Sequence, residues 1–184
     1  MAGWRDEFMQ AVLKIAVGQY VSANWPNPVE QAIVAAQSGL ELLGWVRFVE
    51  GGEVSAPDRR DLAKIPAPKK LQMLLDIGGI DPSIPPSLTA LPGLDPNWSS
   101  GPGVVVGVRN RLVHPRKKSG QVSWTHDVLI EVWLLASRYL ELCLLHLLGV
   151  TSGVRDRLNS DVWVGSIKAP PWAPKSAQGE GVEE

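Results

Sequence analysis

Residues 125–149 read THDVLIEVWLLASRYLELCLLHLLG, and this apolar run decides the class of fold. It predicts a helix that a cap at Thr125 or Ser123 opens, that runs through Leu148 and that Gly149 stops. Four side chains within the run would be costly in lipid, so we expect a buried helix of a soluble bundle rather than a membrane span. These are Glu131, Arg138, Glu141 and His146.

A second long helix is predicted from VEQAIVAAQSGLELLGWVRFVE, which ends at Gly51-Gly52. We expect Asn27 to cap this helix, with Pro28 at its first helical position. The two long helices, near 28–50 and 125–149, are the predicted core pair. The sequence therefore predicts an all-α fold, a helical bundle with Pro-rich irregular connections.

The other segments are shorter or irregular. Apolar residues at three- and four-residue steps predict an amphipathic helix over 4–22. We expect a loop with at most one helical turn over 53–68 and then a short helix that begins at Pro68. Six prolines over 81–103 predict irregular structure, with one short helix near 86–91.

Two later segments carry weaker signals. GVVVGV (103–108) favours a strand by propensity, whereas RNRLV (109–113) favours a helix, and this alternative stays open. GVRDRLNSDVW (153–163) is compatible with a further short helix. We predict one domain over 1–167 and a flexible tail over 168–184, because the tail has too few apolar residues to offset its ordering entropy.

The composition is that of one ordinary globular domain. The chain has 184 residues, 45% hydrophobic and 20% charged, and its net charge of −1 excludes a global field that attracts nucleic acid or membranes. Any such attraction must be local. The single Cys143 excludes an intrachain disulfide framework and fits a reducing cytosol. The N-terminus has no continuous apolar segment typical of a secretory signal, so we expect a cytoplasmic protein.

The candidate site lies in GVRNRLVHPRKK, residues 107–118. Pro115 disfavours helical geometry at the preceding residue, so the helix should end at Val113 or His114. His114 would then lie at a helix C-terminus, where the partial negative charge favours imidazolium. Asn110 is four residues earlier on the same face, and the long side chain of Arg109 can reach the same region.

Cations gather around this histidine. No Asp or Glu occurs from Pro96 to His126, which is what a phosphate-binding surface would need. Within that stretch lie Arg109, Arg111, Arg116, Lys117 and Lys118.

These residue types suit cleavage of RNA without a metal. Histidine can transfer the 2′-OH proton, arginine can stabilise the charged phosphorane with parallel hydrogen bonds, and asparagine can orient either partner. The alternative is structural, because basic residues at a helix C-terminus commonly complement the helix dipole. Spacing alone favours this structural reading.

The stretch RNRLVHP resembles the R-x(4–6)-H signature of HEPN domains, with Asn110 as the polar residue after the arginine. The following helix SRYLELCLLHLLGV and the turn SGVRDRL resemble the end of the ApeA-like HEPN group. The helix IVAAQSGLELLGWV is similar to that group's first core helix, with Glu41 at its acidic position. The resemblance covers roughly residues 10–160.

The resemblance implies a helical bundle that often dimerises, with a composite, metal-independent endoribonuclease site in catalytic members. Arg109 and His114 map onto the motif ends and Asn110 onto the polar position, while Arg111, Arg116, Lys117 and Lys118 would bind the RNA backbone. No cofactor is implied. The expected partners are RNA, a second copy of the chain, and a neutralising or activating protein of a toxin or abortive-infection system, with no membrane.

The sequence departs from related toxins at one position, and two non-catalytic functions stay open. Toxins paired with nucleotidyltransferases usually have a tyrosine two residues after the histidine, where this chain has Arg116, so such an antitoxin is not expected. The main alternative is a catalytically silent module that binds RNA or a protein through the same basic residues. A sensor or regulatory dimer is a third reading.

The remaining histidines and aspartates are interpreted as structural. His126-Asp127 is expected to form part of a helix cap, because adjacent residues on a helix do not face each other. His146 is expected to lie in the core or an interface. Three scattered histidines and one cysteine give no zinc spacing. Asp58, Asp61 and Lys64 are expected in a solvated loop. Three tryptophans in Pro-rich contexts could be exposed for base stacking, or could pack loops onto the bundle. They are Trp25, Trp98 and Trp172.

Overall fold

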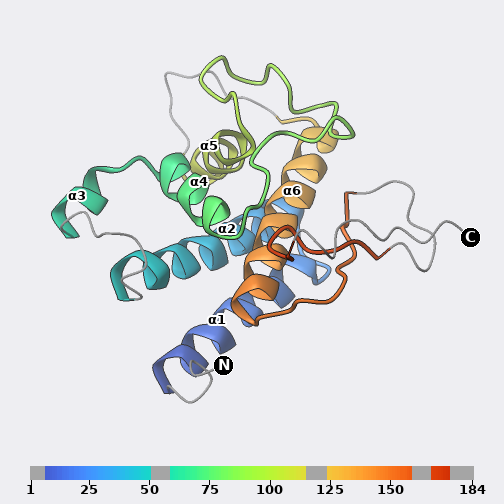
Figure 1. The fold of residues 1–184 in the computed structure, drawn as a ribbon. Coiled ribbons are helices and arrows are strands. Elements are labelled where there is room, and N and C mark those ends of the chain that lie inside the picture. The colour runs from blue at the N-terminus through green and yellow to red at the C-terminus, as the bar shows by residue number, and fades with distance from the viewer. Residues whose placement is uncertain (1–6, 51–58, 115–123, 159–166, 175–184) are drawn as a thin grey trace, which may run out of the picture.

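The computed structural model describes residues 7–50, 59–114, 124–158 and 167–174, and these form an all-α bundle as predicted (Figure 1). An isolated bridge between Val154 and Lys168 is the only β pairing in those ranges. The elements are α1 (Glu7–Asn24), α2 (Val29–Trp45), the π-helical turn η2 (Val46–Glu50), α3 (Arg59–Lys64), α4 (Ala67–Ile77), α5 (Gly101–Val113) and α6 (His126–Leu147).

The two long helices form the core pair, as predicted. Helix α2 packs against α1, α5 and α6, and its Ile33 and Leu40 are almost completely buried. Helix α6 contributes Leu135 and Leu140, which are also buried. Helices α4 and α5 pack against each other and against the α2–α6 pair (Figure 1).

Helix α2 and its π-helical extension have the composition of a membrane span. By length and hydropathy alone, Val29–Val49 is the one described helical stretch that could cross a bilayer. However, 56% of its apolar window is buried within the bundle. A core helix that packs against other helices on most of its faces produces the same apolar pattern.

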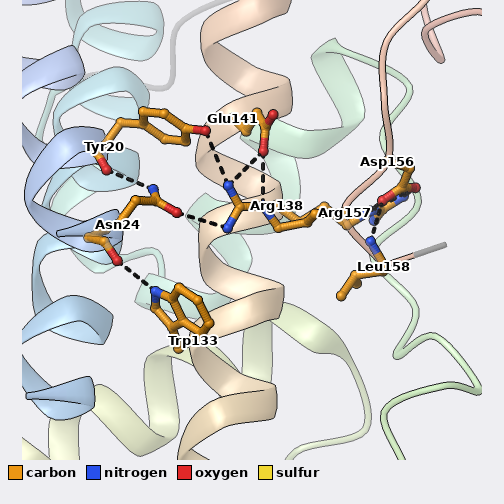
Figure 2. Close-up of polar contacts among 9 residues, drawn as sticks. Tyr20, Asn24, Trp133, Arg138, Glu141, Asp156, Arg157 and Leu158 are labelled. Carbon is orange, nitrogen blue, oxygen red and sulfur yellow. Dashed lines mark hydrogen bonds and ion pairs between the residues drawn. The ribbon is translucent and has the colours of Figure 1, made fainter. Parts of the chain in front are cut away.

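The ionisable residues of α6 attach irregular segments to the core. Glu131 accepts a hydrogen bond from the backbone N–H of Ala90 at 2.8 Å. Arg138 donates a bidentate pair of hydrogen bonds to Asp156, with Nε–Oδ1 and Nη2–Oδ2 distances of 2.9 Å (Figure 2). The polar residues that interrupt the apolar run therefore have partners within the protein, as the reading of a buried helix requires.

The Pro-rich connection contains turns but no helix near 86–91, so that expectation is wrong. Leu88 and Leu91 are buried against the core. The N–H of Ala90 is bonded to Glu131 rather than to a helical carbonyl. Side-chain burial and this bond to α6 replace the local hydrogen bonds that a helix would need.

Several helix ends also differ from expectation. Asn27 does not cap α2, because Pro28 is the N-cap and the Asn27 amide instead donates to the carbonyl of Ser22 at 3.1 Å. The expected loop over 53–68 contains α3, whose Leu62 is buried against the core. Asp58 lies outside the described residues, whereas Asp61 and Lys64 belong to this helix.

The C-terminal segments are attached to the bundle rather than helical or detached. Residues 153–158 form no helix, because Asp156 and Arg157 are hydrogen-bonded to α6. Trp172 donates its indole N–H to the carbonyl of Val150 at 2.6 Å. The first part of the predicted tail, residues 168–174, thus packs onto the bundle, while 175–184 lie outside the described residues.

Candidate functional site

Helix α5 carries the candidate site, and its first turn resolves the ambiguity between strand and helix. Ser100 caps the helix, with its hydroxyl accepting from the N–H of Gly103 at 3.3 Å. Pro102 lies in the first turn, where its missing N–H costs nothing. Residues 101–103, expected within the irregular stretch 81–103, therefore form the start of a helix. The valines are buried on all sides, which explains their strand-like composition.

A shared carbonyl fixes the start of α5 on α6. The backbone oxygen of Pro82 accepts from the N–H of Gly101 at 2.9 Å and from the hydroxyl of Tyr139 at 3.2 Å. A Cβ at Gly101 would lie less than 3.0 Å from that hydroxyl, so a side chain there would displace it. Burial raises the pKa of Tyr139 well above its ordinary value, which keeps the hydroxyl protonated as a donor.

A tryptophan from the Pro-rich connection packs against the middle of α5. A Cβ at Gly107 would lie less than 3.0 Å from the ring of Trp98, so glycine is required for this approach. The Trp98 ring lies 6.0 Å from that of Trp124, between centroids. Trp98 and Trp172 are thus half-buried packing residues, whereas Trp25 is 66% exposed.

Arg111 is held against this tryptophan. Its guanidinium carbon lies 4.4 Å from the Trp98 ring centroid, and its Nη2 pairs with the carboxylate of Asp95. The backbone N–H of Asn97 holds the pKa of Asp95 below its ordinary value, and Arg111 lowers it further. Asp95 directly precedes the acid-free stretch, so Arg111 is engaged within the protein. A role in binding RNA would have to compete with these contacts.

Arg109 points to a different neighbour, helix α2. Its Nη2 lies 3.6 Å from Oε2 of Glu41, an ion pair without hydrogen-bond geometry. Its Nη1 donates to Oδ1 of the adjacent Asn110 at 3.2 Å. Its Nε is buried and has no hydrogen-bond partner among the described residues. The side chain is 21% exposed. Glu41 and Asn110 hold the guanidinium in place, while its Nε donor stays unused.

Glu41 joins Arg109 to a buried amide that the sequence analysis missed. Gln37 Nε2 donates to Oε1 of Glu41 at 3.3 Å, one turn earlier on α2. Gln37 is only 2% exposed, and its own Oε1 accepts no hydrogen bond from the described residues. The i, i+4 spacing of a glutamine and a glutamate within an apolar helix is the signal that could have revealed this pair.

His114 ends the helix, as Pro115 predicted. It is the C-cap residue, and its backbone N–H donates to the carbonyl of Asn110 at 2.9 Å. Both side chains are exposed. The structure therefore brings Arg109, Asn110 and His114 to one solvent-facing end of α5. The other three predicted cations, Arg116, Lys117 and Lys118, lie outside the described residues.

The other titratable candidates take structural positions. Thr125 caps α6 through its hydroxyl, which leaves His126 and Asp127 exposed in the first turn. The ring of His146 packs at 5.0 Å from that of Trp172, between centroids. Burial raises the pKa of Cys143 to about 12, as expected for an unreactive core thiol. Across the described ranges, His, Cys, Asp and Glu form no group of three that could hold a metal ion.

Together these features define a class of protein, an all-α bundle whose buried helix α5 ends in an exposed asparagine and histidine beside a half-buried arginine. The chain belongs to the YopA C-terminal domain family, whose pattern matches residues 6–169. It is 28% identical over 170 residues to the SPbeta prophage-derived uncharacterized protein YopA of Bacillus subtilis (strain 168). That match covers 91% of this chain but 37% of the relative, so the chain spans well under half of it. No solved structure matches the chain.

Proposed function

We propose that this domain is a HEPN-like, metal-independent endoribonuclease that acts as a homodimer in a toxin or phage-defence setting. The observation that carries the proposal is the Arg109 guanidinium, which is held beside Asn110 and Glu41 with its buried Nε unused. A buried unused donor costs free energy unless a ligand supplies an acceptor. A phosphate oxygen would be such an acceptor once the Arg109 side chain turns toward the substrate, because the Nε is closed to solvent in the free protein.

The residues would divide the chemistry as follows. His114 takes the proton of a 2′-OH, whose oxygen attacks the adjacent phosphorus. Arg109 stabilises the negative charge on the phosphorane, and Asn110 orients the substrate or the histidine. The bond to the 5′-oxygen breaks, and that oxygen leaves with a proton. The products are a 2′,3′-cyclic phosphate and a 5′-hydroxyl.

A homodimer would supply a second histidine to the site. The reaction needs both a general base and a general acid, and each copy offers one histidine at the end of α5. The surface beside His114 is partly apolar, since Val113 is 37% exposed and lines a shallow groove with Val34 and Ala35 of α2. Such a surface suits contact with a second copy. A strict monomer in light scattering at micromolar concentration would contradict the composite site.

Two further points support the setting. The motif and its following helix resemble HEPN domains, among which toxins and phage-defence nucleases are common. The relative's name describes it as prophage-derived, which is compatible with a function in phage biology. This chain matches 37% of that relative, and the proposal concerns the matched domain alone.

The test is cleavage of pooled cellular RNA in EDTA by the wild type, His114→Ala and His126→Ala. His126 is also exposed at a helix end, so its substitution is a matched control. We expect cyclic-phosphate products from the wild type and the control, and a loss of at least about 10²-fold in His114→Ala. Equal cleavage by His114→Ala would overturn the assignment. Salt-sensitive RNA binding without cleavage by any variant would favour the silent binding module instead.

A further inference from the structure

A cavity of about 420 Å³ lies between α2, η2, α3, α4 and α5. This volume falls within the range of small-molecule sites in proteins, and most of the lining is apolar. The apolar walls include Leu40, Gly44, Phe48, Leu62, Leu71 and Val106. The cavity is separate from the exposed end of α5, although Glu41 contacts both.

The polar part of the wall is a pair of hydrogen-bond acceptors. Gln37 and Glu41 both line the cavity, and the Gln37 amide donates to the Glu41 carboxylate. Gln37 is only 2% exposed, yet its Oε1 atom accepts no hydrogen bond from the described residues. A buried acceptor without a partner from the protein is rare in native proteins, so a water molecule or a ligand is expected to supply the donor.

The backbone around the cavity is also unusual. Helix α2 continues into the π-helical turn η2, whose Phe48 and Val49 line the cavity. Single π-helical turns are uncommon and frequently occur at functional sites. Gly44 precedes this turn, and a Cβ there would meet Phe48 at 3.5 Å, an ordinary contact. The packing therefore does not require glycine at this position, but a larger side chain would enter the cavity.

We infer that this cavity binds a small amphipathic amine. Its apolar body would fill the cavity, and its ammonium group would donate to the Glu41 carboxylate. It would also donate to Gln37 Oε1 once the Gln37 amide turns toward it, because this atom has almost no accessible surface in the ligand-free protein. Lys70 also lines the cavity, but a lysine can keep its ammonium group in water while its stem covers apolar surface. Gln37 Oε1 is buried, and the half-exposed Glu41 carboxylate is held by the Gln37 amide. Both are acceptors, which favours an amine over an acid. This inference does not depend on RNA cleavage.

The experiment compares two probes of equal chain length, n-octylamine and octanoate, by isothermal titration against the full chain. We expect the amine to bind at least about tenfold more tightly, because a charge-assisted hydrogen bond replaces an unmade one. Equal binding of the two probes, tighter binding of octanoate, or no binding of the amine at millimolar concentration would each overturn the inference.

Variants locate the site. Gly44→Leu fills the cavity and should abolish amine binding, and Ala63→Trp on α3 blocks its wall if the first variant does not fold. Glu41→Gln should remove most of the preference for the amine. Glu30→Gln, on the same helix but away from the cavity, should bind as the wild type does. Amine binding that survives both Gly44→Leu and Ala63→Trp would place the ligand elsewhere and overturn the inference.

Gln37→Leu gives an independent readout. The substitution removes the unpartnered acceptor and places an apolar side chain of similar size in the core. We expect the ligand-free variant to unfold at the same or a higher temperature than the wild type, while its affinity for n-octylamine falls at least about tenfold. A variant that loses stability but keeps its affinity would show that Gln37 serves the fold alone.

Discussion

Two arginines of this bundle each pair with a glutamate of a core helix, and they do so very differently. Arg157 uses all three guanidinium nitrogens (Figure 2). Its Nε donates to Glu141 of α6 at 2.9 Å, its Nη1 to Asn24 of α1 at 3.0 Å and its Nη2 to the hydroxyl of Tyr20 at 3.1 Å. This guanidinium joins the C-terminal segment to two helices.

Arg109 is as buried as Arg157 but much less used. The side chains are 21% and 20% exposed, respectively. The Nη2 of Arg109 stands 3.6 Å from Glu41, its Nη1 bonds only to the neighbouring Asn110, and its Nε has no partner in the described ranges. The bonds of Arg157 join parts of the fold, whereas we propose that Arg109, with its unused donor, binds a ligand.

The largest expected effect concerns activity, and it rests on the proposed function. Arg109→Ala should lower RNA cleavage by about 10²-fold or more, because it removes the cation that stabilises the phosphorane. Arg157→Ala, assayed well below its unfolding temperature, should stay within a few-fold of the wild type. Comparable losses in both variants would show that the two arginines do not differ in role.

Stability should follow the reverse order. Arg157→Ala should lower the free energy of unfolding by about 2 kcal/mol, because it leaves Glu141 and two other partners with unmade bonds. Arg109→Ala should cost less than about 1 kcal/mol, since the lost ion pair is long and half exposed and a buried unused donor is also removed. Urea unfolding followed by circular dichroism measures both.

Double-mutant cycles sharpen the comparison. The coupling between Arg157 and Glu141 should be about 1 kcal/mol, as expected for a short, partly buried pair. The coupling between Arg109 and Glu41 should be below about 0.5 kcal/mol. A stronger Arg109–Glu41 coupling would mean that the pair is structural, and the case for Arg109 as a ligand-binding residue would weaken accordingly.

The smallest effect is a pH dependence near the bonded arginine. Burial alone would raise the pKa of Asp156, but hydrogen bonds from Arg138 bring it below its ordinary value of 3.8. Because the folded pKa is the lower one, this stabilisation is complete above the ordinary value and is lost as the pH falls through the folded value. Asp156→Asn should therefore unfold at a lower temperature than the wild type at pH 7.

The pH dependence of the stability difference between the wild type and Asp156→Asn tests this prediction. We expect a stability difference below about 1 kcal/mol at pH 7 that narrows as the pH falls below 3.8. Calorimetry of the two proteins between pH 7 and pH 3 measures it. A difference that stays constant over this range would mean that the Arg138–Asp156 pair does not link protonation to folding.

The sequence predicted those features that depend on local pattern. Long apolar runs with clear ends identified α2 and α6, and Pro115 located the end of α5 at His114. The type of α5 could not be predicted from its valines, because its burial on all sides comes from neighbours that are distant in the chain. Gly107 illustrates this, since its requirement arises from the ring of Trp98.

The sequence predicted only those parts of the candidate site that depend on local helical spacing. Helical spacing placed Arg109 and Asn110 in the last turns of the helix that ends at His114, and all three residues lie there. Arg111 was counted as one of a cluster of free cations, but Asp95 and Trp98 reach it from an irregular segment whose path has no periodic signal. The unused acceptor of Gln37 depends on three-dimensional packing alone, so only its spacing from Glu41 was visible.

The contacts of α1 with the C-terminal half of the chain also set an order of folding. The indole of Trp133 bonds to the carbonyl of Ala23 across 110 residues, and Arg157 bonds to Tyr20 across 137 (Figure 2). On the ribosome, α1 and α2 can pair early because they are adjacent, but these bonds must wait until most of the chain has emerged. Closing such long loops is slow, so we expect the nascent domain to expose the apolar face of α2 until α6 is made.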